Sequence, residues 1–162
     1  MIKQIEIDVS AEQAWAEIID LDITAFRHSV ILQLLGVPKP LFAELQNPSP
    51  NGQRVAHFAN GKTFTQQITR WDAQANFEFT FVAEPGFRVG YLLDLQKGAF
   101  QMKSGAYRIE KISDGVRLYL SSKYQLTGLI GAILALPVRI VLYMFQRYLL
   151  KGIREKLEVA NG

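Results

Sequence analysis

Residues 126–159 read LTGLIGAILALPVRIVLYMFQRYLLKGIREKLEV and carry most of the helical apolar pattern in this chain. After Pro137, apolar residues recur at helical spacing, and the missing N–H of a proline suits the first position of a helix. The apolar face consists of Val138, Val141, Leu142, Phe145, Leu149, Ile153 and Leu157. The opposite side carries Gln146, Arg147, Lys151, Arg154, Glu155 and Glu158. This pattern predicts a long amphipathic helix with one face on a core.

The part of this helix just after Pro137 is apolar around its whole circumference, because Ile140, Tyr143, Met144 and Leu150 fill the positions outside the core face. Such a helix is surrounded by protein, by a bound apolar molecule or by lipid. A helix that crosses a membrane is not expected here. Pro137 and Arg139 lie in the middle of the apolar segment, and a central arginine costs about 2.5 to 3.5 kcal/mol on insertion scales.

Composition restricts the possible classes of protein. At 162 residues, 49% hydrophobic and 20% charged, the chain fits one globular domain spanning residues 1–162. Cysteine is absent, which excludes structural disulfides, thiolate catalysis and Cys-ligated metal sites. The first eight residues alternate charged and apolar side chains and lack a signal-peptide core, so a cytoplasmic location is expected. The net charge of +3 is small and dispersed, so we expect no nucleic-acid partner.

The first 35 residues predict a strand followed by two short helices. Residues 3–9 alternate as in a half-buried strand, and Ser10 with Gln13 forms a capping box for a helix over residues 11–20. Asp22 is expected to cap a second helix that ends near Leu35, before Gly36. The side chains expected to face inward are Ile5, Ile7 and Val9, then Ala14, Trp15, Ile18 and Ile19, then Ile23, Phe26, Val30 and Leu34.

Beyond Pro40 the hydrophobic period changes from helical to two, and Asn-Gly, Pro-Gly and Asp-Gly pairs mark turns. Six antiparallel strands are expected, over residues 41–46, 53–59, 62–71, 76–83, 99–112 and 116–126. In the clearest of them, Phe77, Phe79 and Phe81 point to one side, while Glu78 and Thr80 point to the other. This alternation predicts a sheet with one dry face and one wet face.

This order of elements, with Val9-Ser10-Ala11-Glu12-Gln13-Ala14-Trp15 opening the first helix, resembles the START-like (SRPBCC, or helix-grip) superfamily. Its polyketide cyclase/dehydrase-like branch is the most similar. The hairpin of residues 62–71 and 76–83 also matches, as does the terminal pair of strands, Ala106-Tyr107-Arg108-Ile109-Glu110-Lys111-Ile112 followed by Gly115-Val116-Arg117-Leu118. The resemblance covers nearly the whole chain, in the pattern of its elements rather than in a catalytic signature.

The resemblance implies an α+β fold in which a curved antiparallel sheet of about seven strands wraps around the C-terminal helix. Two short helices follow the first strand. It also implies a cavity between sheet and helix that binds a lipid, sterol, polyketide or other hydrophobic ligand. The helix that is apolar all round and the phenylalanine-lined sheet are compatible with such a cavity, and equally with side chains that simply pack on one another.

Polar residues with a chemical role are few. His28 and His57 have no acidic or histidine neighbours at metal-ligand spacing, and no phosphate-binding or dinucleotide motif is present, so neither a metal nor a cofactor is expected. His57 shares a strand face with Val55 and Ala59, opposite Arg54, Ala56 and Phe58, and the inward face stays open. Tyr107 and Arg108 point to opposite sides of their strand, so at most one of them faces a cavity.

We therefore predict binding of a hydrophobic small molecule or lipid, with its transport as a further role. The predicted ligand-binding residues are Phe64, Phe77, Phe79, Phe81, Tyr107, Leu118, Tyr124, Val141, Phe145, Leu149, His57 and Arg108. Two alternatives stay open. One is a cyclase or dehydratase that acts on a polyketide-like or aromatic substrate with a tyrosine, His57 or Arg108 in the same cavity. The other is a membrane-surface or protein-interaction role, with residues 126–136 as a lid or an inserted element.

Overall fold

A computed structural model describes residues 1–90, 93–95 and 98–161 of the chain. In chain order the elements are β1 (Ile2–Ile7), α1 (Ala11–Ile19), α2 (Val30–Leu34), β2 (Pro40–Leu45), β3 (Gln53–Phe58), β4 (Thr63–Asp72), β5 (Asn76–Ala83), β6 (Arg88–Val89), β7 (Leu93–Asp94), β8 (Phe100–Ile112), β9 (Gly115–Leu126) and α3 (Gly128–Asn161). The six strands predicted after Pro40 are present as β2 to β5, β8 and β9. The short pair β6 and β7 was not predicted.

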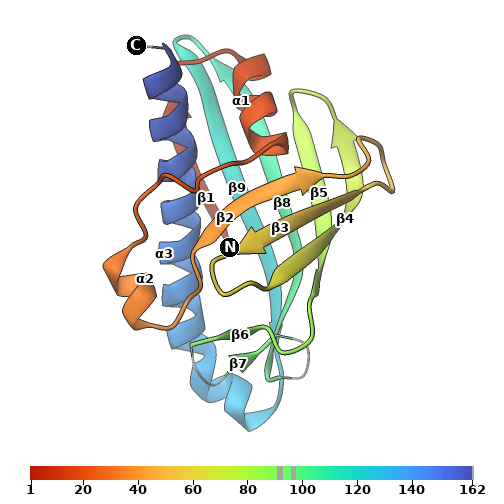
Figure 1. Ribbon diagram of the computed structural model, residues 1–162, viewed down its shortest axis with the longest axis vertical. Helices are drawn as coiled ribbons and strands as arrows, with labels where there is room; N and C mark the ends of the chain where they lie inside the picture. The colour runs from red at the N-terminus through yellow and green to blue at the C-terminus, as the bar shows by residue number, and fades with distance from the viewer. Residues whose placement is uncertain (91–92, 96–97, 162) are drawn as a thin grey trace.

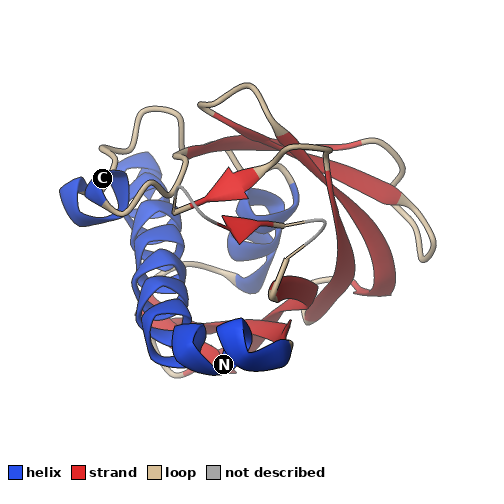
Figure 2. Ribbon diagram, turned by 90° about the horizontal axis from the view of Figure 1, so that it is seen from below, coloured by secondary structure: helices blue, strands red, loops and turns tan. Residues whose placement is uncertain are grey.

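Seven strands form one antiparallel sheet in the order β1-β9-β8-β5-β4-β3-β2. The sheet curls, and α3 lies along its open side (Figures 1 and 2). Phe77 and Phe79 on β5 are buried inside this curl, whereas Glu78 lies on the outer surface. The predicted helix-grip architecture, with one dry and one wet face of the sheet, is therefore confirmed.

Helix α1 begins where its capping box predicts. The Ser10 side chain accepts a hydrogen bond from the Gln13 backbone N–H, and the Gln13 side chain accepts one from the Ser10 backbone N–H. Two donors that would otherwise lack partners are thereby satisfied. Ala14 and Ile18 are fully buried, so the helix fixes one end of the curled sheet.

The second helix is shorter than predicted. Only Val30–Leu34 is helical, with Ser29 rather than Asp22 at its N-cap, and Asp22 instead joins a bridge to Phe42. The predicted inward direction of Val30 and Leu34 is wrong, because both are more than half exposed. The five-residue helix buries Leu32 alone, and one turn presents too narrow a face to bury the others.

The long helix starts nine residues before Pro137, at Gly128, so the prediction that Pro137 opens it is wrong. Pro137 lies inside the helix, where it has no N–H to donate to the carbonyl of Ile133. The first turns of α3 are directed away from the axis of the rest (Figure 1), and an interior proline is the usual cause of such a bend. The helix therefore begins at a projecting end of the molecule.

Gly152 permits a loop to approach the helix backbone closely. A Cβ at this position would lie 3.1 Å from Phe26 Cδ1 and 3.3 Å from Ile23 Cγ2. The loop between α1 and α2 therefore packs directly on the helix backbone. This contact holds the second half of α3 in place and offsets the helical cost of a glycine, which is about 1 kcal/mol relative to alanine.

Candidate functional site: a polar layer in an apolar interior

The space between the concave face of the sheet and α3 is filled by aromatic rings. Phe64, Phe81, Phe79 and Phe77 form a continuous row, with centroids of successive rings 5.0 to 5.7 Å apart. Most of these contacts are edge-on or tilted, the arrangements that aromatic pairs prefer.

The interior side chains fall into two hydrophobic clusters. One contains Ile68, Phe77, Phe79, Leu118, Leu120, Leu149 and Ile153, beside α1. The other contains Phe58, Phe64, Phe87, Phe100, Val138 and Leu142, toward the start of α3. Phe81, Phe145 and Ala56 pack against both. The interior is therefore apolar at both ends.

A layer of buried polar side chains lies at the boundary of the two clusters. β4, β9 and α3 each contribute one polar side chain to this layer. Gln66 lies between Phe64 and Ile68 on β4, Ser122 follows Leu120 on β9, and Gln146 lies between Leu142 and Leu149 on α3. The Gln146 Nε2 donates to the Ser122 Oγ at 2.9 Å. The side-chain oxygens of Gln66 and Gln146 have no hydrogen-bond partner among the described residues. The predicted place of Gln146 on the solvent side is wrong.

Gly105 on β8 leaves space for the rings beside this layer. It pairs with Phe79 on β5 and with Ser122 on β9. A Cβ at this position would lie 2.8 Å from Phe79 Cε2 and 3.1 Å from Phe81 Cζ, closer than real atoms pack. The two phenylalanine rings therefore occupy the space that a side chain at this position would take, and they lie over the sheet backbone.

Arg54 on β3 is the largest fully buried side chain of the described residues, with 2% of its surface exposed. It pairs across the sheet with Gln66, and its guanidinium lies over the Phe77 ring, 5.4 Å from the centroid. Its Nε and Nη1 atoms have no hydrogen-bond partner among the described residues. Burial lowers the pKa of this guanidinium, and the nearby Tyr107 and Asp20 oppose that effect. An arginine nevertheless keeps its charge in a protein, so the interior holds an unpaired cation.

Tyr107 faces the same space from β8 and is buried. Burial raises the pKa of its phenol, and the charge of Arg54 acts in the opposite direction. The hydroxyl therefore stays protonated at neutral pH, as a hydrogen-bonding group and not as a base. Among the described residues, the polar side chains of this interior are Arg54, Gln66, Tyr107, Ser122 and Gln146, and the buried carboxylate of Glu17 on α1 pairs with Lys156 on α3 instead.

Ten of the twelve residues predicted to bind a ligand face this interior or its edges. They are Phe64, Phe77, Phe79, Phe81, Tyr107, Leu118, Tyr124, Val141, Phe145 and Leu149. Leu118 is fully buried, whereas Tyr124, Val141 and Phe145 are partly buried. The structure thus brings these side chains together, and their role as ligand contacts remains a prediction.

His57 does not belong to the interior, which corrects its place in the predicted set. Its strand turns Arg54, Ala56 and Phe58 inward, so His57 lies on the outer face with 31% of its side chain exposed. There its ring stacks on Phe42 at 4.4 Å. The Glu44 carboxylate lies 3.8 Å from its Nε2.

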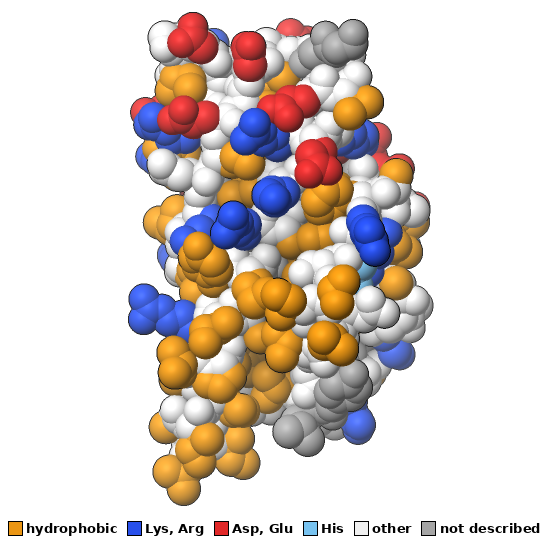
Figure 3. Space-filling model, turned by 90° about the vertical axis from the view of Figure 1, so that its left-hand side faces the viewer, with side chains coloured by type: hydrophobic (Ala, Val, Ile, Leu, Met, Phe, Trp, Pro, Cys, Tyr) orange, Lys and Arg blue, Asp and Glu red, His pale blue; other side chains and the backbone are white. Residues whose placement is uncertain are grey.

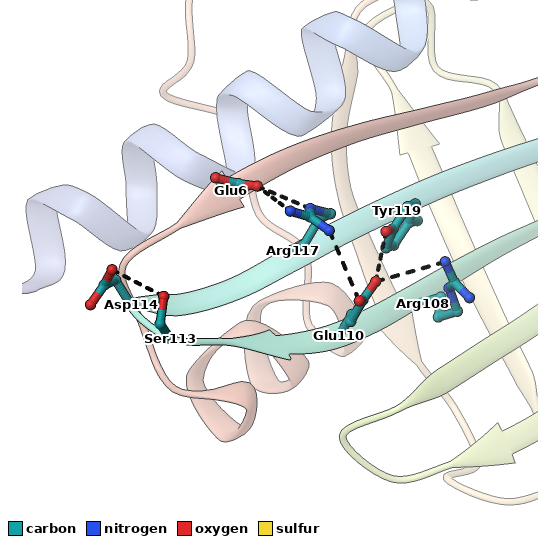
Figure 4. Close-up of polar contacts among 7 residues, drawn as sticks. All are labelled: Glu6, Arg108, Glu110, Ser113, Asp114, Arg117 and Tyr119. Atoms are coloured by element: carbon teal, nitrogen blue, oxygen red, sulfur yellow. Dashed lines mark hydrogen bonds and ion pairs between the residues drawn. The ribbon is translucent and has the colours of Figure 1, made fainter.

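Arg108 also lies outside the interior, which corrects its place in the predicted ligand-binding set. It points to the wet face of the sheet, where its side chain is 57% exposed and its guanidinium lies 4.1 Å from the centroid of the Tyr119 ring. The Tyr119 hydroxyl donates to Glu110 at 2.6 Å, and Arg117 pairs with Glu6 on the neighbouring strand (Figure 4). Tyr107 therefore faces inward and Arg108 faces solvent.

Sequence reasoning missed Arg54, Gln66, Ser122 and Gln146. One signal was available for Arg54, because it shares its strand face with Ala56 and Phe58, which favours the interior. Gln66 likewise alternates with Phe64 and Ile68. For Gln146 the helical pattern pointed to solvent, so only the packing of α3 reveals its burial.

No protein-family model matches this chain, and no curated protein matches its sequence. Solved structures match its fold. Ara h 8.0201 has 14% identity and a TM-score of 0.64, over 98% of this chain and 97% of that chain. TTHA0849 from Thermus thermophilus has 15% identity and a TM-score of 0.62, over 100% and 99%. MLL2253 from Mesorhizobium loti has 12% identity and a TM-score of 0.60, over 98% and 96%.

The fold is the Bet v 1-like helix-grip fold. At these identities the likeness establishes the fold alone, and the polyketide cyclase/dehydrase-like branch is not shown. A helix-grip fold hosts many functions, so the site has to be argued from its own residues.

Two grooves open on the surface of the described part of this helix-grip protein. One, of about 730 Å³, lies beside the start of α1 and the turn between β8 and β9. The other, of about 600 Å³, is lined by Ala99, Gln101, Thr127, Leu129 and Ile130 near the start of α3. Neither contains a residue of the predicted ligand-binding set. The candidate site is therefore defined by the chemistry of the interior.

Proposed function

We propose that this protein binds a hydrophobic small molecule or lipid that carries a carboxylate, with the carboxylate at Arg54. The observation that carries the proposal is the buried Arg54 guanidinium, whose Nε and Nη1 have no hydrogen-bond partner among the described residues. An unpaired buried charge costs several kcal/mol, and a bound anion removes most of that cost. Arginine presents a planar fork of donors that matches a carboxylate.

The polar layer supports the same ligand class. Gln66 and Gln146 offer acceptor oxygens that have no partner within residues 1–90, 93–95 and 98–161, so a hydroxyl on the ligand has two positions in which to donate. The rings on either side supply an apolar surface for the hydrocarbon part. Binding is favoured over acid–base catalysis, because the polar side chains of this layer include no group that titrates near neutral pH.

The test compares cis-parinaric acid, a fluorescent fatty acid, with its methyl ester. The wild-type protein is expected to bind the acid at least tenfold more tightly, since a charge-assisted hydrogen bond contributes about 1.5 to 3 kcal/mol. Arg54→Met should abolish this preference and retain binding of the ester. Arg108→Met is the matched control on the outer face and should leave the preference intact.

The outcomes distinguish the binding of a hydrophobic ligand from the role of Arg54 in that binding. If neither probe binds, the hydrophobic-ligand function is wrong. If both bind equally to the wild-type protein, the function stands and the role of Arg54 is wrong. Native mass spectrometry of gently purified protein, followed by organic extraction, then identifies the natural ligand. Transport, a cytoplasmic location, the polyketide cyclase/dehydrase-like branch and the absence of a cofactor or nucleic-acid partner remain predictions from the sequence.

A further inference from the structure

The first half of α3 presents a stripe of apolar side chains to solvent. It consists of Leu129, Ile130, Ile133, Leu136, Ile140 and Tyr143, which are 40 to 78% exposed. We call these residues the α3 apolar stripe. By length and composition α3 passes the test for a membrane-spanning helix, and only 11% of its most apolar 18-residue window is buried. Single exposed apolar residues are ordinary, whereas a contiguous patch marks an interaction surface.

Helix α2 extends the apolar surface. Its exposed side chains are Val30, Ile31 and Leu34, together with Leu35 just after the helix. Hydrophobic side chains gather over the lower part of the face that carries α2 and the start of α3 (Figure 3). The exposed apolar residues of two elements therefore contribute to one end of the molecule.

The charges near this surface are basic. Residues 115–154 contain no aspartate or glutamate, although Arg139, Arg147 and Lys151 lie among them on α3. These three side chains are exposed and form no ion pair with another described residue. The Lys3 ammonium lies 3.7 Å from the centroid of the Tyr143 ring, at the edge of the stripe. A band of basic side chains borders the apolar region, and the acidic ones lie toward the opposite end of this face (Figure 3).

We propose that the α3 apolar stripe docks this protein on an anionic membrane surface, with Arg139, Arg147 and Lys151 at the lipid headgroups. Apolar side chains on one face and basic side chains beside them are typical of helices that lie in the membrane interface. Long basic side chains keep their charge at the headgroups while their stems cover apolar surface. This inference goes beyond ligand binding and does not depend on it.

Charge decides between a membrane and a second copy of the chain. Two copies joined through the stripe would bring their unpaired arginines and lysines together, with no acidic residue of positions 115–154 to compensate them. Like charges at a contact oppose association. An anionic lipid surface instead attracts each of these cations, at about 1 kcal/mol per residue.

Helix α3 is held in the interface and does not cross the bilayer. Val138 and Leu142 are buried in the hydrophobic cluster near the start of α3, so the face opposite the stripe stays packed on the sheet. Crossing a membrane would require this packing to be undone and Arg139 to enter the hydrocarbon. The bend at Pro137 directs the first turns of α3 away from the axis of the rest of the helix (Figure 1).

The test is co-sedimentation of the full chain with vesicles of phosphatidylcholine, with and without phosphatidylglycerol as about a third of the lipid. The wild-type protein is expected to sediment with the anionic vesicles. The variant Leu129→Ser/Ile133→Ser/Leu136→Ser should bind at least 100-fold more weakly, because each side chain loses its burial in lipid. The matched control is Val82→Ser/Val159→Ser, which alters exposed valines outside the stripe and should bind like the wild type.

A second pair of variants tests the charges. Arg139→Gln/Arg147→Gln should weaken binding to anionic vesicles on the order of tenfold or more. Arg108→Gln/Lys111→Gln removes the same charge from β8, away from the stripe, and should have little effect. Circular dichroism verifies that every variant is folded.

Three results would overturn the proposal: wild-type protein that stays in solution with both vesicle types, binding that survives the triple serine substitution, or equal binding to neutral and anionic vesicles. Light scattering on the same samples tests whether a second copy of the chain covers the stripe instead of a membrane. If the wild type is dimeric and the triple variant monomeric, and neither binds vesicles, the stripe joins two copies of the chain and the membrane proposal is wrong.

Discussion

Arg54 shows how burial and charge oppose each other at a single residue. The guanidinium is inside the aromatic interior, where the Phe77 ring lies over it and the nearby Tyr107 and Asp20 favour its charged form. A cation–π contact of this kind contributes about 2 kcal/mol when desolvated, which is less than the several kcal/mol that the buried charge costs. A residue that lowers stability in this way is typical of a binding site.

Replacing Arg54 with methionine is expected to stabilise the ligand-free protein. The substitution removes the buried charge and keeps an unbranched side chain, so the free energy of unfolding should rise by about 1 to 4 kcal/mol. Urea denaturation measures the change, and Arg108→Met, on the exposed face, should alter stability by less than about 0.5 kcal/mol. A less stable Arg54→Met protein would show that the guanidinium has a structural role.

His28 makes stability depend on pH. Burial, and secondarily the charge of Lys39, lower the pKa of its imidazole from the ordinary value of 6.5. The unfolded chain therefore binds a proton before the folded one does, and stability falls as the pH drops below about 6.5 toward the folded pKa. Urea midpoints measured between pH 7.5 and 5 should show this loss, and His28→Gln should reduce it. An NMR titration that places the pKa of His28 above 6.5 would contradict the proposed role of His28 in this pH dependence.

At the scale of elements, α3 combines two halves with different surroundings. Its second half is held by Leu149, Leu150 and Ile153, which are buried, and by the loop that packs on Gly152. Its first half is attached mainly through Val138 and Leu142 and leaves the apolar stripe outside. Pro137 lies within the first half and removes one helical hydrogen bond from it.

Pro137→Ala should therefore strengthen the first half of α3. The new N–H can bond the carbonyl of Ile133, and replacing an interior proline in a helix contributes up to about 3 kcal/mol. Amide hydrogen exchange is expected to slow over residues 129–136, and the global stability should rise. Ala135→Ser, at an exposed neighbouring position, is the control and should leave exchange almost unchanged. Faster exchange in Pro137→Ala would mean that packing requires the bend.

At the scale of the whole molecule, the α3 apolar stripe and the two tryptophans lie at opposite ends. The apolar stripe lies at the end where α3 begins, while α1 lies toward the other end (Figure 1). Trp15 on α1 packs edge-on against Trp71, 5.2 Å between centroids. A molecule that docks by the stripe therefore holds both tryptophans away from the bilayer.

Fluorescence in vesicles with brominated lipids can measure this orientation. The native tryptophans should be quenched little, whereas a tryptophan introduced by Leu129→Trp should be quenched strongly because it enters the acyl region. Val159→Trp, at an exposed position near the other end of α3, is the control and should escape quenching. Quenching of the native pair in the wild-type protein would mean that another face meets the membrane.

The sequence by itself determined most of the elements of this protein, but not the extent of α2, the start of α3 or the pair β6 and β7. Alternation in β5, the Ser10–Gln13 capping box and the turn pairs act over a few residues, so they are readable without the fold. The helix-grip architecture followed from their order. The inward direction of Phe77, Phe79 and Phe81 followed as well, since three phenylalanines on one strand face can hardly be left in water.

Only the tertiary structure decided what lies inside and what stays uncovered. Alternation separates Arg54 from His57, and Ala56 and Phe58 beside Arg54 favour an inward direction, but the sheet's curl around α3 decides which of the two is buried. Gln146 is buried because it faces Ser122 across the interior, although the helical pattern placed it in water. The α3 apolar stripe is exposed because no described element packs over it. Burial is a property of neighbours distant in sequence, which no local pattern contains.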